Sequence, residues 1–122
     1  MATVKKVLIV EDEHTYIKLM QEQLNANGYE VFSATDGKKG LALAKSQHPD
    51  VILLDIRMPV MDGLEMLNEL RKDSYGKRAK VILLTNLEPN DSMIKNIIDN
   101  KPSYYLIKSD IQLSDLLEKI EE

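Results

Sequence analysis

The chain has 122 residues, no cysteine and a formal net charge of −4 at pH 7. This length suits one domain with a single hydrophobic core, and the lack of cysteine excludes disulfides, thiol nucleophiles and cysteine metal sites. The negative charge argues against a basic surface for nucleic acid, so we expect no direct nucleic-acid binding. No apolar run approaches the roughly 20 residues of a membrane span, and we expect a soluble, cytoplasmic protein with no membrane contact.

Five short apolar runs of strand length recur along the chain. Those at 7–10, 51–54 and 81–84 are unbroken stretches of valine, isoleucine and leucine. Such runs are typical of strands that are covered on both faces in a parallel sheet, which requires helices on both sides. The two remaining runs cover residues 29–34 and 104–107.

The segments that separate these runs carry apolar residues at helical spacing. Asn27 and Gly28 mark the end of the first predicted helix, and the second closes near His48 and Pro49. The helical faces are marked by Ile17, Met20 and Leu24, by Leu41, by Leu64, Leu67 and Leu70, by Met93, Ile94, Ile97 and Ile98, and by Leu113, Leu116, Leu117 and Ile120. The alternation predicts one α/β domain over residues 1–122, with a doubly wound five-stranded parallel sheet in a flavodoxin-like three-layer sandwich.

Polar side chains stand where four of the five predicted strands end. These residues are Glu11 and Asp12 after the first, Asp55 after the third, Thr85 and Asn86 after the fourth, and Lys108 after the fifth. Ligands of open α/β sheets bind beyond the carboxyl ends of the strands, where the strand order reverses. With the order 2-1-3-4-5, the acids, the hydroxyl and the ammonium converge at that point.

Each of these residues also has a simpler interpretation. An acid after a strand is usually a solvated turn residue or a helix N-cap, and Asp12 is a candidate cap for the first helix. His14 is close to the acids in sequence, but we expect it to be solvated on that helix. Agreement between four strand ends favours a site, because clustered carboxylates repel and need a cation among them. Mg²⁺ suits a small open site with few protein ligands better than Ca²⁺.

The sequence resembles the receiver domain of bacterial two-component response regulators, the family of the chemotaxis regulator. The resemblance covers nearly the whole chain, and its most specific segment runs from 55 to 63. It rests on Leu-Ile-Val-Glu-Asp-Glu at 8–13, on Leu-Leu-Asp-Ile-Arg-Met-Pro-Val-Met-Asp-Gly at 53–63, on Leu-Leu-Thr-Asn at 83–86 and on Tyr-Leu-Ile-Lys at 105–108.

This resemblance implies that Asp55 accepts a phosphoryl group as an acyl phosphate. The Thr85 hydroxyl would then donate to the phosphoryl group and Lys108 would pair with it. Neutralising and positioning groups of this kind are what phosphoryl transfer requires. Tyr105 matches the family's aromatic switch, which turns inward when the threonine hydroxyl moves, although it could also be an ordinary half-buried strand residue.

The resemblance also implies a Mg²⁺ site among the acids. Asp12 and Asp55 would be direct ligands, Glu11 would act mainly through water, and the backbone carbonyl of Arg57 would complete the protein ligands. Ser109 stands where the family usually has a proline that follows a cis bond. A non-proline cis bond costs about 2.5 to 4 kcal/mol, so we expect this bond to be trans or strained.

The implied partners are a sensor histidine kinase or a histidine phosphotransfer protein, and either a downstream protein target or an output domain. A homodimer through the fourth helix, fifth strand and fifth helix is a further possibility. The family is one of signalling domains that assist their own phosphorylation and dephosphorylation rather than of enzymes. Three alternatives remain, namely a small phosphohydrolase, which would need an acid where Arg57 stands, a mononucleotide binder, and a receiver-like interaction domain that is never phosphorylated.

Overall fold

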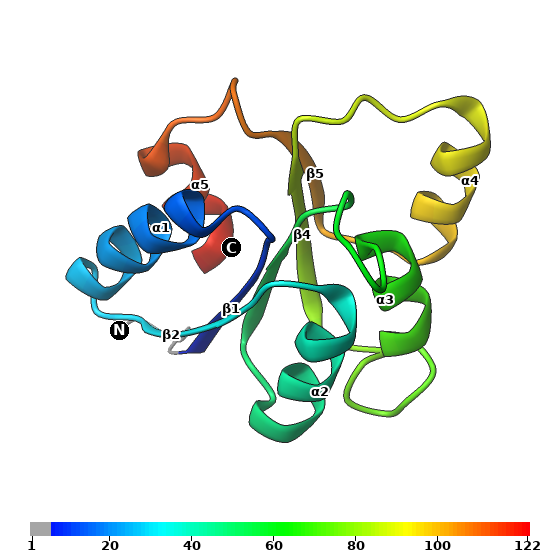
Figure 1. Cartoon of the computed structure of the whole chain (residues 1–122), viewed down its shortest axis with the longest axis horizontal. Helices are drawn as coiled ribbons and strands as arrows, with labels where there is room; N and C mark the ends of the chain where they lie inside the picture. Colours follow the sequence, from blue (N-terminus) through cyan, green and yellow to red (C-terminus); the bar gives the residue numbers. More distant parts are fainter. Residues whose placement is uncertain (1–5) are drawn as a thin grey trace.

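The computed structural model describes residues 6–122, in which strands and helices alternate. The strands are parallel and lie in the order β2-β1-β3-β4-β5, as the sequence predicts (Figure 1). The elements are β1 (Lys6–Val10), α1 (His14–Ala26), β2 (Glu30–Ala34), α2 (Gly37–Gln47), β3 (Val51–Leu54), α3 (Gly63–Leu70), β4 (Lys80–Thr85), α4 (Asp91–Asp99), β5 (Tyr104–Ile107) and α5 (Leu113–Glu121).

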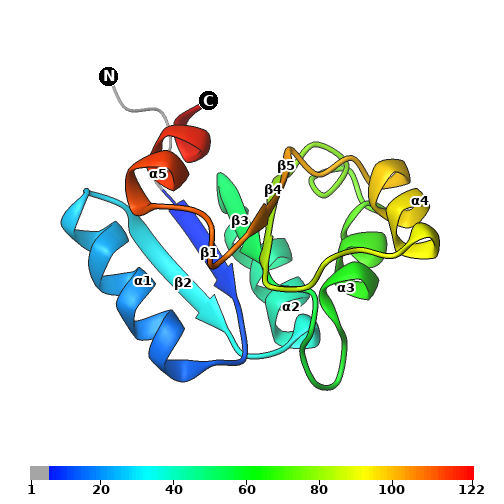
Figure 2. The same cartoon turned by 90° about the horizontal axis from the view of Figure 1, so that it is seen from above.

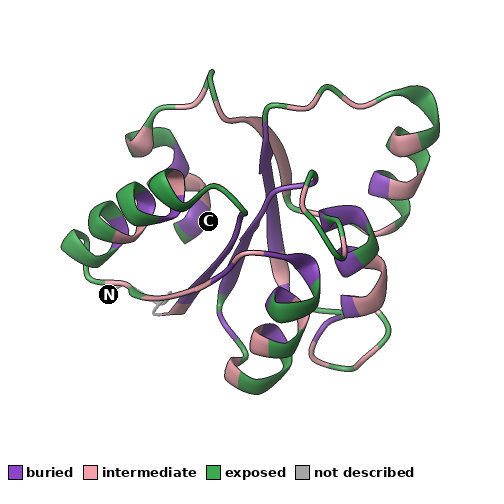
Figure 3. Cartoon of the chain, viewed as in Figure 1, coloured by how far each residue is buried: buried purple, intermediate pink, exposed green. Residues whose placement is uncertain are grey.

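The helices cover the sheet in two layers, with α1 and α5 on one face and α2, α3 and α4 on the other (Figure 2). Alternate residues of each strand therefore enter different cores. On β1, Leu8 and Val10 pack with the layer of α2, α3 and α4, whereas Val7 and Ile9 pack with α1 and α5. The central strands are buried on both faces while the outer sides of the helices are exposed (Figure 3).

The ends of several elements differ from the predicted ranges. β4 is longer at both ends, from Lys80 to Thr85, because β3 and β5 pair with it on its two sides. β2 begins at Glu30, one residue later than expected. The interpretation of Asp12 as a helix cap is wrong, because α1 begins at His14 and Glu13 holds the N-cap position.

The predicted end of α1 at Asn27 and Gly28 is confirmed. Asn27 is the C-cap residue, and Gly28 has a φ of 91°, in the left-handed region that favours glycine. Among residues 6–122, no helix combines the length and apolar character that a membrane crossing requires. The single domain over residues 1–122 stays a prediction, and its first five residues lie outside the described part.

Candidate functional site

An open cleft of about 420 Å³ lies at the carboxyl end of the sheet. Because parallel strands all end on this side, residues far apart in sequence meet here. Seven of the residues selected from the sequence line this cleft, namely Glu11, Asp12, Asp55, Arg57, Thr85, Asn86 and Lys108. Glu13, Leu87 and Glu88 line it as well.

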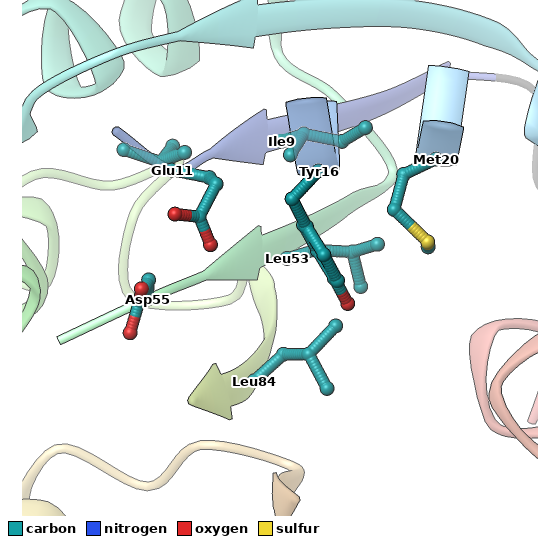
Figure 4. Close-up of a pocket in the computed structure, with 8 residues that line it drawn as sticks. Ile9, Glu11, Tyr16, Met20, Leu53, Asp55 and Leu84 are labelled. Carbon is teal, nitrogen blue, oxygen red and sulfur yellow. The ribbon is translucent and has the colours of Figure 1, made fainter. Parts of the chain in front are cut away.

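Three carboxylates form the floor of the cleft. One oxygen from each of Glu11, Asp12 and Asp55 lies within 4.8 Å of the other two, so a single ion can reach all three. Glu11 and Asp55 are buried, whereas Asp12 is exposed. Figure 4 shows the Glu11 and Asp55 side chains side by side at the ends of β1 and β3. His14 is exposed and is not part of this cluster.

The backbone fixes the two buried carboxylates. Oε2 of Glu11 accepts the Glu13 N–H at 2.9 Å, and Oδ1 of Asp55 accepts the Ile56 N–H at 2.7 Å. The peptide N–H groups of Glu11 and Asp55 donate to Ala34 and Val10, which continues the sheet pairing beyond the strand ends. These bonds hold both side chains in place before any ligand binds.

Lys108 supplies the positive charge that the acids need. Its ammonium donates to Oε1 of Glu11 and lies 3.1 Å from Oδ2 of Asp55. Burial lowers the pKa of Lys108, but its bonds to Glu11 and Asp55 outweigh that effect and leave the pKa above its ordinary value. Burial raises the pKa of Glu11, and the Asp55 charge adds to this, while Lys108 and the Glu13 N–H oppose it. One ammonium therefore bonds to two of the three clustered carboxylates, and the cluster favours a further cation.

The loop after Asp55 folds back tightly behind this carboxylate. The Gly63 N–H donates to the Ile56 carbonyl at 2.8 Å, and a Cβ at this position would lie 2.0 Å from the Asp55 carbonyl oxygen. Only glycine fits there. Asp62 caps α3 by accepting the Glu65 N–H at 2.9 Å. The Asp-Gly pair of the motif thus closes the turn that shapes the cleft.

Thr85 and Tyr105 lie on the β4 side of the cleft. Thr85 is 2% exposed, and its hydroxyl accepts the Leu87 N–H at 3.3 Å. The Tyr105 hydroxyl donates to the Leu87 carbonyl, so both side chains hold the same loop residue. Tyr105 is partly buried beside the cleft and does not line it.

The segment after Lys108 is tied to the same loop by its backbone. No peptide bond among residues 6–122 is cis, so the Lys108–Ser109 bond is trans, one of the two outcomes expected without proline. The Ser109 N–H donates to Oδ1 of Asn86 at 3.0 Å, a bond that proline has no hydrogen to make. The Lys108 N–H donates to the Thr85 carbonyl at 2.9 Å.

Tyr16 is the site residue that sequence reasoning missed. The Lys108 ammonium lies over its ring, 4.4 Å from the centroid. Burial raises the pKa of the Tyr16 hydroxyl, and the ring stays neutral beside the acids. The sequence feature that could have pointed to Tyr16 is its position, four residues after Asp12 of the acidic pair and next to the core residue Ile17.

Comparison with known proteins agrees with this geometry. A family model described as the response regulator receiver domain matches residues 7–121. The chain belongs to this family. It is 41% identical over 68 residues to the alkaline phosphatase synthesis transcriptional regulatory protein PhoP of Bacillus subtilis, which is 56% of this chain and 28% of that protein. The match is therefore to less than a third of the regulator's length.

Two solved structures show the same fold for a receiver domain. The chemotaxis protein CheY4 of Vibrio cholerae superposes with a TM-score of 0.85 at 30% identity, over 97% of each chain. The receiver domain of the sensor histidine kinase PA1611 of Pseudomonas aeruginosa gives a TM-score of 0.84 at 28% identity, over 97% of this chain and 95% of that one. That structure has a magnesium ion coordinated in its active site cleft. The present chain is thus a receiver domain of two-component signalling.

Proposed function

We propose that this receiver domain accepts one phosphoryl group on Asp55. The observation that carries the proposal is the convergence of Asp55 with two further acids, Lys108 and Thr85 at one open cleft. A phosphohydrolase with a second acid two residues after the nucleophile is disfavoured, because Arg57 holds that position. A mononucleotide site is disfavoured as well, since the acids after β1 would repel a phosphate.

The reaction requires a nucleophile, a cation and a hydrogen-bond donor from this chain. A carboxylate oxygen of Asp55 forms the new bond to phosphorus, while the bond from phosphorus to the donor breaks and its electron pair leaves with the donor. Lys108 stands 3.1 Å from Asp55 and can pair with the charged phosphoryl oxygens. Thr85 lines the same cleft with a hydroxyl that can donate to the phosphoryl group once it turns from Leu87.

The acid cluster fits Mg²⁺. All its donors are oxygens, they are close enough to share one ion, and their number leaves room for water, which Mg²⁺ retains. Asp12 and Asp55 would be direct ligands, Glu11 would act mainly through water, and Arg57 would contribute its backbone carbonyl. When bound, Mg²⁺ would offset the charge of the acids and of the entering phosphoryl group.

We further propose that Thr85 and Tyr105 transmit the phosphorylated state. Both hold Leu87, one through its N–H and the other through its carbonyl, so a turn of the Thr85 hydroxyl toward a phosphoryl group releases one of these two bonds. Loss of this bond would free the loop before α4 to move. The displaced Thr85 hydroxyl would leave space into which the Tyr105 ring can turn. A ligand that binds one loop arrangement better shifts the population toward it.

The partners follow from this chemistry. A sensor histidine kinase or a histidine phosphotransfer protein would be the donor, in the cytoplasm, and a downstream protein or an output domain would read the state. The surface of α4, β5 and α5 is the proposed output face and the place for a homodimer. The domain would work as a signalling module rather than as an enzyme that turns over a substrate.

The test is phosphorylation by acetyl phosphate with Mg²⁺, read by intact mass. We expect wild type to gain one phosphoryl group and Asp55→Asn to gain none, since the nucleophilic oxygen is lost. Asp110→Asn, a change at an exposed aspartate two positions after Lys108, is the matched control and should react like wild type. Phosphorylation of Asp55→Asn to the wild-type extent would show that another residue is the acceptor. A wild type that never reacts would favour the unphosphorylated interaction domain.

A further inference from the structure

The Lys108 ammonium contacts three groups among the described residues. Two are the carboxylates of Glu11 and Asp55, and the third is the ring of Tyr16. The proposed reaction alters the first two, because Asp55 changes its charge and bonding, and the acids are the candidate ligands of a cation. The Tyr16 ring carries no charge and takes part in no bond change. The reaction itself therefore does not change this third contact.

Tyr16 is held firmly enough to serve as a support. It belongs to the first turn of α1 and packs against the core between α1, α5 and the sheet. Figure 4 shows its ring beside Leu53 and Leu84, with the carboxylates of Glu11 and Asp55 to one side. These residues share a small cavity of about 10 Å³ beneath the site. The ring is thus held from the core side and reaches the Lys108 ammonium.

The ring rather than the hydroxyl is the part that matters. Among residues 6–122 the Tyr16 hydroxyl makes no hydrogen bond, whereas the ring centroid lies 4.4 Å from the Lys108 ammonium. A cation at this distance over an aromatic face is attracted by the ring quadrupole. The attraction is stronger where water is excluded, and the Lys108 side chain is only 11% exposed.

Hydrogen bonds to the loop after β4 hold the backbone of Lys108 and Ser109, but they do not set the direction of the Lys108 ammonium. A lysine stem has four flexible carbons between the backbone and the ammonium. Contacts of the side chain must therefore set its direction once the carboxylates are occupied.

We propose that the Tyr16 ring positions the Lys108 ammonium for phosphoryl transfer through a cation–π contact. The proposal rests on the proposed function and makes Tyr16 a positioning residue that acts through Lys108. A residue that only packs the core would act whether or not Lys108 is present, and this difference can be measured.

The first experiment is a double-mutant cycle on the rate of phosphorylation by acetyl phosphate with Mg²⁺. Tyr16→Leu removes the aromatic face and should slow phosphorylation about fivefold relative to wild type. Tyr16→Phe keeps the aromatic face, and its rate should be within about twofold of the wild-type rate. In a Lys108→Met background, Tyr16→Leu should have an effect of less than about 1.5-fold. An equal fall in both backgrounds, or a Phe variant as slow as the Leu variant, would overturn the proposal.

The second experiment uses the metal-free protein and needs no phosphorylation. A ring that faces the end of the Lys108 side chain should shift its εCH₂ proton signals upfield in NMR spectra, with Lys108→Met identifying them. The shift should remain in Tyr16→Phe and vanish in Tyr16→Leu. Unshifted signals in wild type would overturn the proposal. A shifted signal together with no phosphorylation would instead reject the proposed function and leave the contact in place.

Discussion

The two ends of the sheet use charged side chains in opposite ways. At the carboxyl end, Lys108 bonds to two of three clustered carboxylates, so the charges do not balance without a ligand. At the amino end, the cations of Arg71 and Lys80 bind backbone carbonyls of the chain itself and need no further ligand. Arg71 donates to the carbonyls of Gly76, Ala79, Asn100 and Lys101, and Lys80 donates to those of Lys119, Ile120 and Glu122.

This difference separates stability from function. Most of the carbonyls that lose their donor at the amino end are left in a partly buried place, which costs free energy of folding. Acids that lose their charge at the carboxyl end relieve repulsion, but the site then loses affinity for a cation or a phosphoryl group. The two ends are therefore expected to respond oppositely to substitution.

The largest expected effect is at Arg71. Arg71→Ala removes donors from four carbonyls that join the loops before β4 and β5, and should lower the free energy of unfolding by about 2 to 3 kcal/mol. Urea denaturation measures this. Arg78→Ala is the matched control, since Arg78 is exposed, and should change stability by less than about 0.5 kcal/mol. The folded Arg71→Ala protein should still be phosphorylated on Asp55, and a loss of that reaction would contradict the separation of the two ends.

The next effect concerns Mg²⁺ at the carboxyl end. Since Mg²⁺ is expected to bind the folded acid cluster and not the unfolded chain, a concentration tenfold above its Kd should add about 1.4 kcal/mol to the free energy of unfolding. Asp12→Asn should abolish this gain and, without Mg²⁺, stabilise the domain by relieving repulsion. His14→Ala is the control, because magnesium prefers oxygen ligands to imidazole. Equal losses of the gain in both variants would make His14 a ligand.

Sequence patterns predicted the fold and the convergence of the site for a clear physical reason. Parallel strands buried on both faces leave unbroken apolar runs, and the residues after them must meet at one edge of the sheet. Glu11, Asp55 and Thr85 were found this way.

Those patterns do not show which side chains of distant elements come into contact. Tyr16 looks like one more core residue of α1 until its ring is seen beside Lys108. The simpler interpretation of Asp12 as a helix cap also fails, because Glu13 holds the N-cap position and the Glu11 carboxylate accepts the Glu13 N–H. The first case depends on a contact between distant elements, and the second on a local bond within the turn after β1, and neither follows from the spacing of apolar residues.

A smaller, local effect should follow a phosphoryl mimic. With beryllium fluoride and Mg²⁺, amide NMR shifts should concentrate from Thr85 through α4 and around Tyr105, and should leave the amides around Arg71 almost unmoved. A population change from 1:99 to 99:1 requires about 5.5 kcal/mol of differential binding, so we expect a partial shift. Thr85→Ala should suppress the changes in α4 while keeping those at Asp55. Changes confined to the acids in wild type would show that the domain binds the mimic without switching.

The smallest expected effect is an alkaline one at the amino end. The Tyr75 hydroxyl donates to the Pro49 carbonyl at 2.9 Å, and burial, aided by Asp50 and Asp73, raises its pKa from 10 to about 12. Its pKa is higher in the folded state than in the unfolded state, so its contribution to stability is complete below pH 10 and is lost as the pH rises through 12. The difference in unfolding free energy between wild type and Tyr75→Phe should therefore be constant from pH 7 to 9. Toward pH 11, wild type should lose stability relative to Tyr75→Phe. Urea titrations at these pH values measure it. A difference that already changes near pH 7 would mean that the amino end also carries unbalanced charge, and the contrast between the two ends would fail.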